Sequence, residues 1–174
     1  MLYVSALASR EIRALLLALK QAEPEIRKEV NNRSKLEVTS IWKQAIAEEA
    51  SSSFGRTQRA RVKVIANTAK ASVGTKGVRL SAATTGRPLS GGLNGKTQWQ
   101  ALEFGATESV RTIRSTSKLG KSYTTTRNVH AQLDLRNRKG YLFYPAAKES
   151  VPRILSLWVQ TAVKTLAEVV ERKA

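Results

Sequence analysis

Near the C-terminal end of the chain, apolar residues recur at steps of three and four. They are Val151, Ile154, Leu155, Trp158, Val159, Ala162, Val163, Leu166 and Val170. This spacing predicts an amphipathic helix over 146–174 with one buried face. Ser150 can cap its start, and Pro152 then falls in the first turn, where a missing amide donor does no harm.

The first 55 residues also show helical spacing. Ile12, Leu15, Leu16 and Leu19 form one apolar stripe, and Pro24 ends that helix because proline disrupts a helix interior. A second helix is predicted from Pro24 to about Ser51, roughly 40 Å long if it is continuous. The polar run 31–34 leaves a break in its middle open.

Between these helical ends the apolar period changes to two, which is typical of strands. The runs 61–73 and 77–83 predict a hairpin, and 98–104 and 140–144 predict two further short strands. A loop rich in glycine, proline and serine is expected over 85–95.

The segment from Glu108 to Arg138 is rich in serine, threonine and basic residues, and its apolar residues are too sparse to form a face. Residues 110–117 and 122–129 can pair around a turn at 118–121 as a long exposed ribbon. A loop that is disordered in the isolated subunit is the alternative.

Together these elements predict a single α+β domain over 1–174. A small, mostly antiparallel sheet is packed by the N-terminal helices and by the C-terminal amphipathic helix. The expected parts are a helical region 1–55, a β-rich basic region 56–145 with an extended arm at about 106–139, and the C-terminal helix 146–174.

Charge changes this picture, because the formal net charge of +17 is concentrated in the middle of the chain. Residues 1–55 hold eight basic and seven acidic side chains, and residues 140–174 hold five and three. Residues 56–139 hold seventeen basic and three acidic side chains, a net of +14. Such a field attracts polyanions, although an acidic neighbouring protein would serve as well as nucleic acid.

The densest part of this charge lies in the arm. It consists of Arg111, Arg114, Lys118, Lys121, Arg127, Arg136, Arg138 and Lys139. Zinc-finger ligands and an aromatic RNA-binding strand are both missing from the sequence, so any DNA contact is expected to be with the backbone, without base readout.

Catalytic chemistry is poorly represented. The chain has no cysteine and one histidine, His130, which is expected to be exposed. The run 90–97 ends in Gly95-Lys96-Thr97 like a phosphate-binding loop, but it lacks the first glycine and the preceding strand. We expect no enzyme, no cofactor and no metal; a phosphotransfer enzyme or nuclease using Lys96 or Asp134 is the competing hypothesis.

No apolar run approaches the roughly 18 residues of a membrane span, because Arg10 and Arg13 interrupt the N-terminal one. The sequence therefore predicts a soluble protein that is not secreted and has no membrane partner.

Three short motifs follow one another in an order that resembles a known family. They are Leu89-Ser90-Gly91-Gly92-Leu93, then Trp99 to Ala106 (WQALEFGA), then Gly140 to Ala147 (GYLFYPAA) before the last helix. This arrangement resembles the minor tail and head-to-tail connector proteins of long-tailed bacteriophages, and the resemblance covers roughly residues 85–172.

The resemblance implies a virion structural protein in the phage neck, most simply a tail terminator or tail-completion protein. Its copies would form a homo-oligomeric ring, often hexameric, that contacts adjacent neck proteins and the major tail tube protein. Non-specific contact with packaged DNA is compatible with such a ring. The protein would lie in the host cytoplasm before assembly. A non-specific DNA-binding protein acting outside the virion is the alternative.

Glu103, Phe104 and Gly105 are the candidate interface residues within these motifs. On the predicted strand, Phe104 anchors the core and Glu103 points outward, where a basic group of the next subunit can reach it. Gly105 permits the turn that follows.

Overall fold

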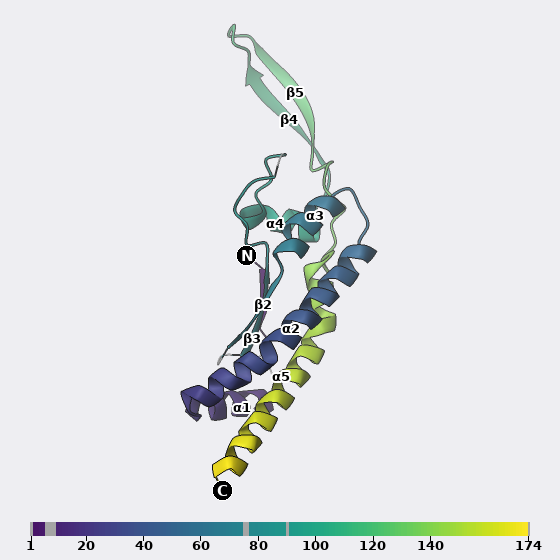
Figure 1. Ribbon diagram of the computed structural model, residues 1–174. Helices are drawn as coiled ribbons and strands as arrows, with labels where there is room; N and C mark the ends of the chain where they lie inside the picture. The colour runs from purple at the N-terminus through teal and green to yellow at the C-terminus, as the bar shows by residue number, and fades with distance from the viewer. Residues whose placement is uncertain (1, 6–9, 75–76, 90, 174) are drawn as a thin grey trace.

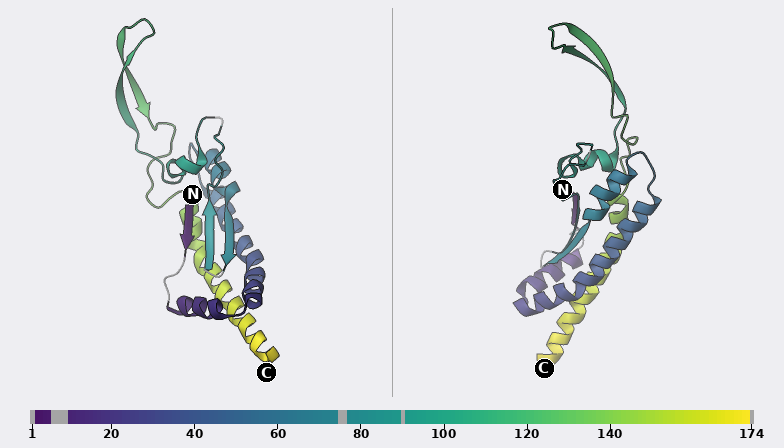
Figure 2. Two further views of the ribbon diagram at one scale, coloured as in Figure 1. Left: turned by 90° about the vertical axis from the view of Figure 1, so that its left-hand side faces the viewer. Right: turned by 45° about the horizontal axis from the view of Figure 1, so that its top comes forward.

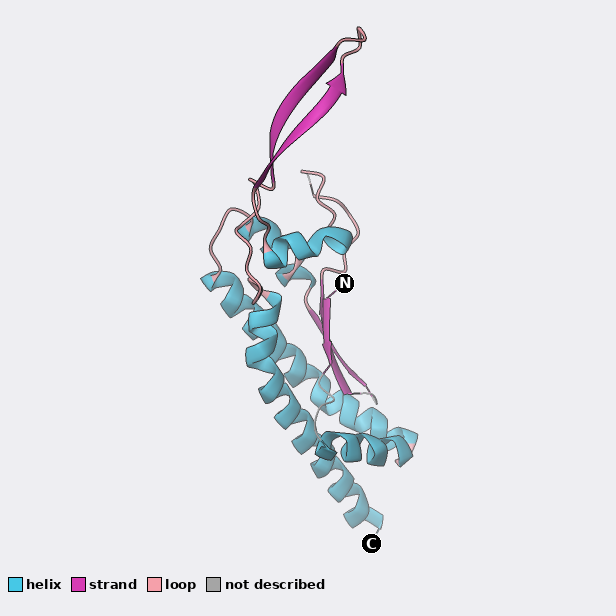
Figure 3. Cartoon of the chain, turned by 180° about the vertical axis from the view of Figure 1, so that it is seen from behind, coloured by secondary structure: helices cyan, strands magenta, loops and turns pink. Residues whose placement is uncertain are grey.

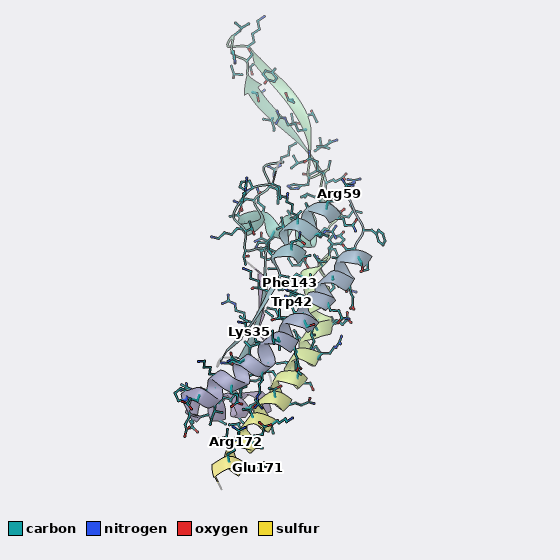
Figure 4. All side chains as sticks on the ribbon, in the orientation of Figure 1. Lys35, Trp42, Arg59, Phe143, Glu171 and Arg172 are labelled. Atoms are coloured by element: carbon teal, nitrogen blue, oxygen red, sulfur yellow. The ribbon has the colours of Figure 1, made fainter. Side chains whose placement is uncertain are left out.

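Two long helices run side by side in opposite directions through the body of the molecule (Figure 1). They are α2, Pro24–Ser52, and α5, Phe143–Lys173, of 29 and 31 residues, each about 45 Å long at 1.5 Å per residue. Trp42 of α2 meets Phe143 of α5 edge to face, with ring centroids 5.2 Å apart. Figure 4 shows the two rings in the middle of the body, and both are fully buried.

The structure is a computed structural model that describes residues 2–5, 10–74, 77–89 and 91–173. The remaining elements are β1 (Leu2–Ser5), α1 (Arg10–Gln21), α3 (Gln58–Val64), a 3-10 turn η1 (Ala66–Thr68), β2 (Lys70–Gly74), β3 (Gly77–Ala82), α4 (Gly95–Phe104), β4 (Ser109–Thr116) and β5 (Ser122–Val129). Mixed helix and sheet confirm the predicted α+β class.

A three-stranded antiparallel sheet lies beside the two long helices (Figure 2). β3 is its central strand and pairs with β1 and with β2, so that Leu80 lies opposite both Val4 and Ala71. Leu80 and Ala82 are buried in the core shared with α2 and α5. The predicted hairpin therefore exists as β2 and β3, while the strand β1 was not predicted.

The N-terminal helices agree with their sequence pattern. α1 ends before Pro24, and α2 runs without a break through 31–34. Ser34 in that stretch is buried in the helix interface. A second apolar cluster joins α1, α2 and α5 through Leu19, Val30, Trp158 and Ala162.

The predicted strand over 61–73 is wrong in its first half, where the chain forms α3 and η1 instead. Arg61 and Val64 are both buried. Because they are three residues apart, they share one face of a helix, whereas a strand would place them on opposite faces.

The predicted strand over 98–104 is also wrong, because these residues belong to α4. The side chain of Asn94 accepts a hydrogen bond from the amide of Lys96 at 3.0 Å, and the amide of Asn94 donates to Gln98 Oε1 at 2.8 Å. This reciprocal cap starts a helix, and it turns Leu102 and Glu103 inward together.

The predicted strand over 140–144 is replaced by the start of α5, which begins at Phe143. Ser150 and Pro152 consequently lie inside the helix and not at its start. The apolar pattern gave the buried face correctly, but the first turn is held by a distant carboxylate described below.

β4 and β5 form the predicted ribbon. The pairing runs in register from Ser109 opposite Val129 to Thr116 opposite Ser122. Figure 3, seen from behind, shows this ribbon standing clear of the helices and of the three-stranded sheet.

Candidate functional site

The ribbon, β4 and β5, contains no buried residue: each of its sixteen residues is exposed or half-buried. Alternation along the strands gives it two faces. Ile113 and Tyr123 share one face and are 40% and 50% exposed. A two-stranded hairpin is marginally stable alone in water, so these exposed faces are available to a partner.

Like charges face each other on the ribbon. Arg111 lies directly opposite Arg127, an arrangement that destabilises an isolated pair of strands. Arg114 lies on the other face, and Lys118 and Lys121 flank the turn at the tip. The sequence from Ser109 to Leu133 contains no acidic residue, and within the described part of the chain none of these five cations forms an ion pair.

The root of the ribbon, the two connecting segments 105–108 and 130–142, is fastened to the body by Arg56. Its guanidinium donates to Glu108 Oε1 at 2.7 Å and to the carbonyl oxygen of Ala131 at 2.6 Å. Arg56 thus holds both segments, and the acid nearest to the ribbon is already paired.

Asp134, in the returning segment, is buried beside α3. It accepts hydrogen bonds from the amides of Arg56 at 2.6 Å and Thr57 at 3.2 Å, from the Thr57 hydroxyl, and from Arg61 in a buried ion pair. Burial opposes ionisation of Asp134, but these donors outweigh it and hold the pKa of the carboxyl below its ordinary value. The Cζ atom of Arg61 lies over the Tyr141 ring, 4.3 Å from the ring centroid.

Glu103 is fully buried and Phe104 is only half-buried, so the expectation that Phe104 anchors the core while the Glu103 carboxylate points outward to a neighbouring subunit is wrong. The carboxylate accepts hydrogen bonds from the amides of Leu142, Phe143 and Tyr144 at 3.0 to 3.4 Å. These amides open α5 and have no partner within that helix. Burial raises the pKa of Glu103, and the three amide donors oppose that rise.

Two glycines allow this packing. Gly105 has φ +63°, and a Cβ there would overlap the carbonyl oxygens of Asp134 and Leu135. Gly140 has φ +82°, and a Cβ there would overlap the carboxylate of Glu103. The turn predicted at Gly105 is therefore present, and it lets the two root segments pass in contact.

An open cavity of about 690 Å³ lies at the root of the ribbon, and we call it the root cleft. Its lining includes Gln100, Phe104, Ser109, His130, Arg136 and Arg138. The Phe104 ring is flanked by Trp99 and Tyr144, with centroids 6.2 and 5.4 Å away. The cleft therefore combines an aromatic wall with cationic side chains.

No protein-family model, curated protein or solved structure matches the chain. The function is therefore inferred from the ribbon, its root and the root cleft.

The structure brings only some of the predicted site residues together. Phe104 and Gly105 meet Arg136 and Arg138 around the root cleft. Lys139 is exposed in the same returning segment, whereas Lys118 and Lys121 lie at the far tip. His130 is exposed as predicted, with Nδ1 3.4 Å from the carbonyl oxygen of Thr107, and its place in the cleft was not foreseen.

Of the two residues of the competing enzyme hypothesis, Asp134 is engaged in the fold, whereas Lys96 is exposed. Asp134 is held by the donors described above, and the backbone amide of Lys96 is used by the cap of α4. In the described ranges, no three histidine or acidic side chains gather closely enough to hold a metal ion. None of the helices in that part of the chain combines the length and apolar character that crossing a bilayer requires.

Proposed function

We propose that this chain is a structural subunit of a long-tailed bacteriophage, and that identical copies form a ring in the neck where the tail tube meets the head. The ribbon is the observation that carries this proposal. It projects from the body without a buried residue of its own, and such an arm gains its stability by docking on a neighbouring molecule.

The motifs that resemble the connector family also support the proposal. The end of α4 and the start of α5 are joined through Glu103 and the amides of Leu142, Phe143 and Tyr144. Together with Gly105 they form the base from which the ribbon extends. The second and third motifs therefore act as one structural unit that positions an arm, which supports a role in tail termination or tail completion.

A heterologous contact between identical subunits closes into a ring when its rotation permits. In the proposed ring, each ribbon reaches the adjacent copy, and the outer faces meet adjacent neck proteins and the major tail tube protein. The protein would be found in the virion, and in the host cytoplasm before assembly.

Assembly can be measured by size-exclusion chromatography with light scattering and by negative-stain electron microscopy. We expect a closed ring from the full chain and a monomer when residues 110–128 are replaced by a short Gly-Ser linker. A matched control is Lys28→Gln with Arg172→Gln, which alters charge on α2 and α5 and leaves the ribbon intact; it should still form the ring.

The alternative is a DNA-binding protein that acts outside the virion, which the unpaired charge on the ribbon favours. A full chain that stays monomeric, alone and with tail tube protein, and that shifts DNA in a gel would support this alternative and overturn the ring.

A further inference from the structure

We propose that the root cleft binds single-stranded nucleic acid, with a base stacked on Phe104 and phosphates bound by Arg136, Arg138, Arg111 and Arg127. This goes beyond ring assembly, because it assigns a ligand to a cleft within one subunit and does not depend on a neighbouring copy.

The Phe104 ring, which forms the aromatic wall of the root cleft, packs against other aromatic rings of the body. Phe104 packs against Tyr144, Tyr144 packs against Phe143 with centroids 5.7 Å apart, and Phe143 packs against the fully buried Trp42. Trp99 supports Phe104 from within α4. A half-buried ring fixed in this way offers a preorganised apolar surface, and every base can stack on such a surface regardless of sequence.

Cations continue from the cleft onto the ribbon. Arg136 and Arg138 line the cleft and are exposed. Ser109, also in the lining, is the first residue of β4, and Arg111 follows two positions later on the same face of the ribbon, opposite Arg127. A phosphate between Arg111 and Arg127 would turn their mutual repulsion into two charge-assisted hydrogen bonds.

The distribution of charge along the chain favours a polyanionic ligand over a second copy of the chain. Residues 1–55 and 140–174 carry net charges of only +1 and +2, from eight basic against seven acidic and five against three. A second copy therefore offers these arginines no acidic region of comparable strength. Nucleic acid supplies one phosphate per nucleotide, and an unpaired strand also supplies free base faces that a duplex keeps stacked inside.

Fluorescence anisotropy with labelled oligo-dT of about twelve nucleotides, the matching oligo-U and a duplex of equal length tests the proposal. We expect both single strands to bind about tenfold more tightly than the duplex. Phe104→Leu, which keeps an apolar side chain, should weaken single-strand binding about tenfold and leave duplex binding unchanged. Circular dichroism confirms that the variant is folded.

Charge variants that leave the core untouched provide the second measurement. Arg111→Gln with Arg127→Gln should lower the slope of log affinity against log salt by about 0.7, since the two arginines share one phosphate and each phosphate contact on a single strand contributes about 0.7. Arg136→Gln with Arg138→Gln should weaken binding of oligo-dT about tenfold or more. The control pair Lys28→Gln and Arg172→Gln removes the same charge from α2 and α5 and should change neither value.

Three results would overturn the proposal: a duplex bound as tightly as the single strands, Phe104→Leu without effect, or an equal loss in the control pair. Effective competition by a Glu-rich peptide of equal charge would show instead that the cleft accepts acidic protein. Because binding is measured separately from oligomeric state, a monomer that binds oligo-dT contradicts the ring and not the cleft.

Discussion

Asp134 and Arg61 place opposite charges together in the interior. Replacing Asp134 with Asn leaves the Arg61 cation buried without its partner, which costs about 3 to 5 kcal/mol of unfolding free energy in comparable sites. Urea denaturation of Asp134→Asn should show this loss, and Glu108→Gln, which breaks only the exposed Arg56–Glu108 pair, should stay within about 1 kcal/mol of the parent. Equal midpoints for the two variants would contradict the structural role of the buried pair.

The same carboxyl predicts how stability depends on pH. Because the pKa of Asp134 is lower in the folded chain than in the unfolded chain, its contribution is present above the ordinary aspartate value of about 4 and is lost as pH falls through the folded pKa. Urea unfolding from neutral to acidic pH should therefore show a steeper fall for the parent than for Asp134→Asn. Parallel curves would mean that Asp134 does not titrate differently on folding.

The role of the Glu103 carboxylate in capping α5 can be tested with a nearly isosteric substitution. Glu103→Gln keeps one carbonyl acceptor but turns an amide group toward the backbone donors of 142–144. At least one buried N–H then loses its acceptor, which costs roughly 1 to 3 kcal/mol. Chemical denaturation should reveal that loss near neutral pH, and an unchanged midpoint would show that α5 starts without this cap.

Neither buried carboxylate could be placed from the sequence. Asp134 is 73 residues from Arg61, and Glu103 is about 40 from the amides that it caps. Periodic patterns in the sequence cannot predict contacts between residues that are so far apart along the chain. The exposed position of His130 and the turn at Gly105 depend on local sequence, and both were predicted.

The stability of the body depends little on the ribbon. Since none of its residues is buried, replacing 110–128 with a Gly-Ser linker should leave the free energy of unfolding of the body within about 0.5 kcal/mol of the parent. Thermal and urea unfolding measure this directly. A large loss would mean that the ribbon supports the body, and the assembly test on the same variant would then report misfolding.

At the scale of elements, helices were predicted correctly where one spacing of apolar residues dominates the segment. α1 and the buried face of α5 followed from such patterns, and the ribbon followed from the turn at 118–121. α4 was mistaken for a strand because its apolar residues are few; the signal that could have identified it was Asn94 followed by Gln98, whose side chain and amide groups bond reciprocally. The start of α5 could not be found locally, because Glu103 lies outside the segment.

In the molecule as a whole, burial of two of the three acidic side chains in 56–139 increases the net positive charge of the residues outside the core. Of seventeen basic and three acidic residues in 56–139, Arg61, Glu103 and Asp134 are buried. Without these three, the formal net charge of the segment is +15. Eight of those cations lie on the ribbon and its root, at the end opposite Glu171 and Arg172 (Figure 4). An anionic surface therefore attracts the ribbon end first.

The register of the ribbon also constrains how such an arm can evolve. Side chains alternate with a period of two, so inserting one residue in a strand would exchange its faces and turn Arg111 away from the side it shares with Ser109. Adding two residues to each strand preserves both faces and moves the tip outward by about 7 Å. Arms of this kind can therefore lengthen in paired steps, fitting larger or smaller assemblies while the root stays unchanged.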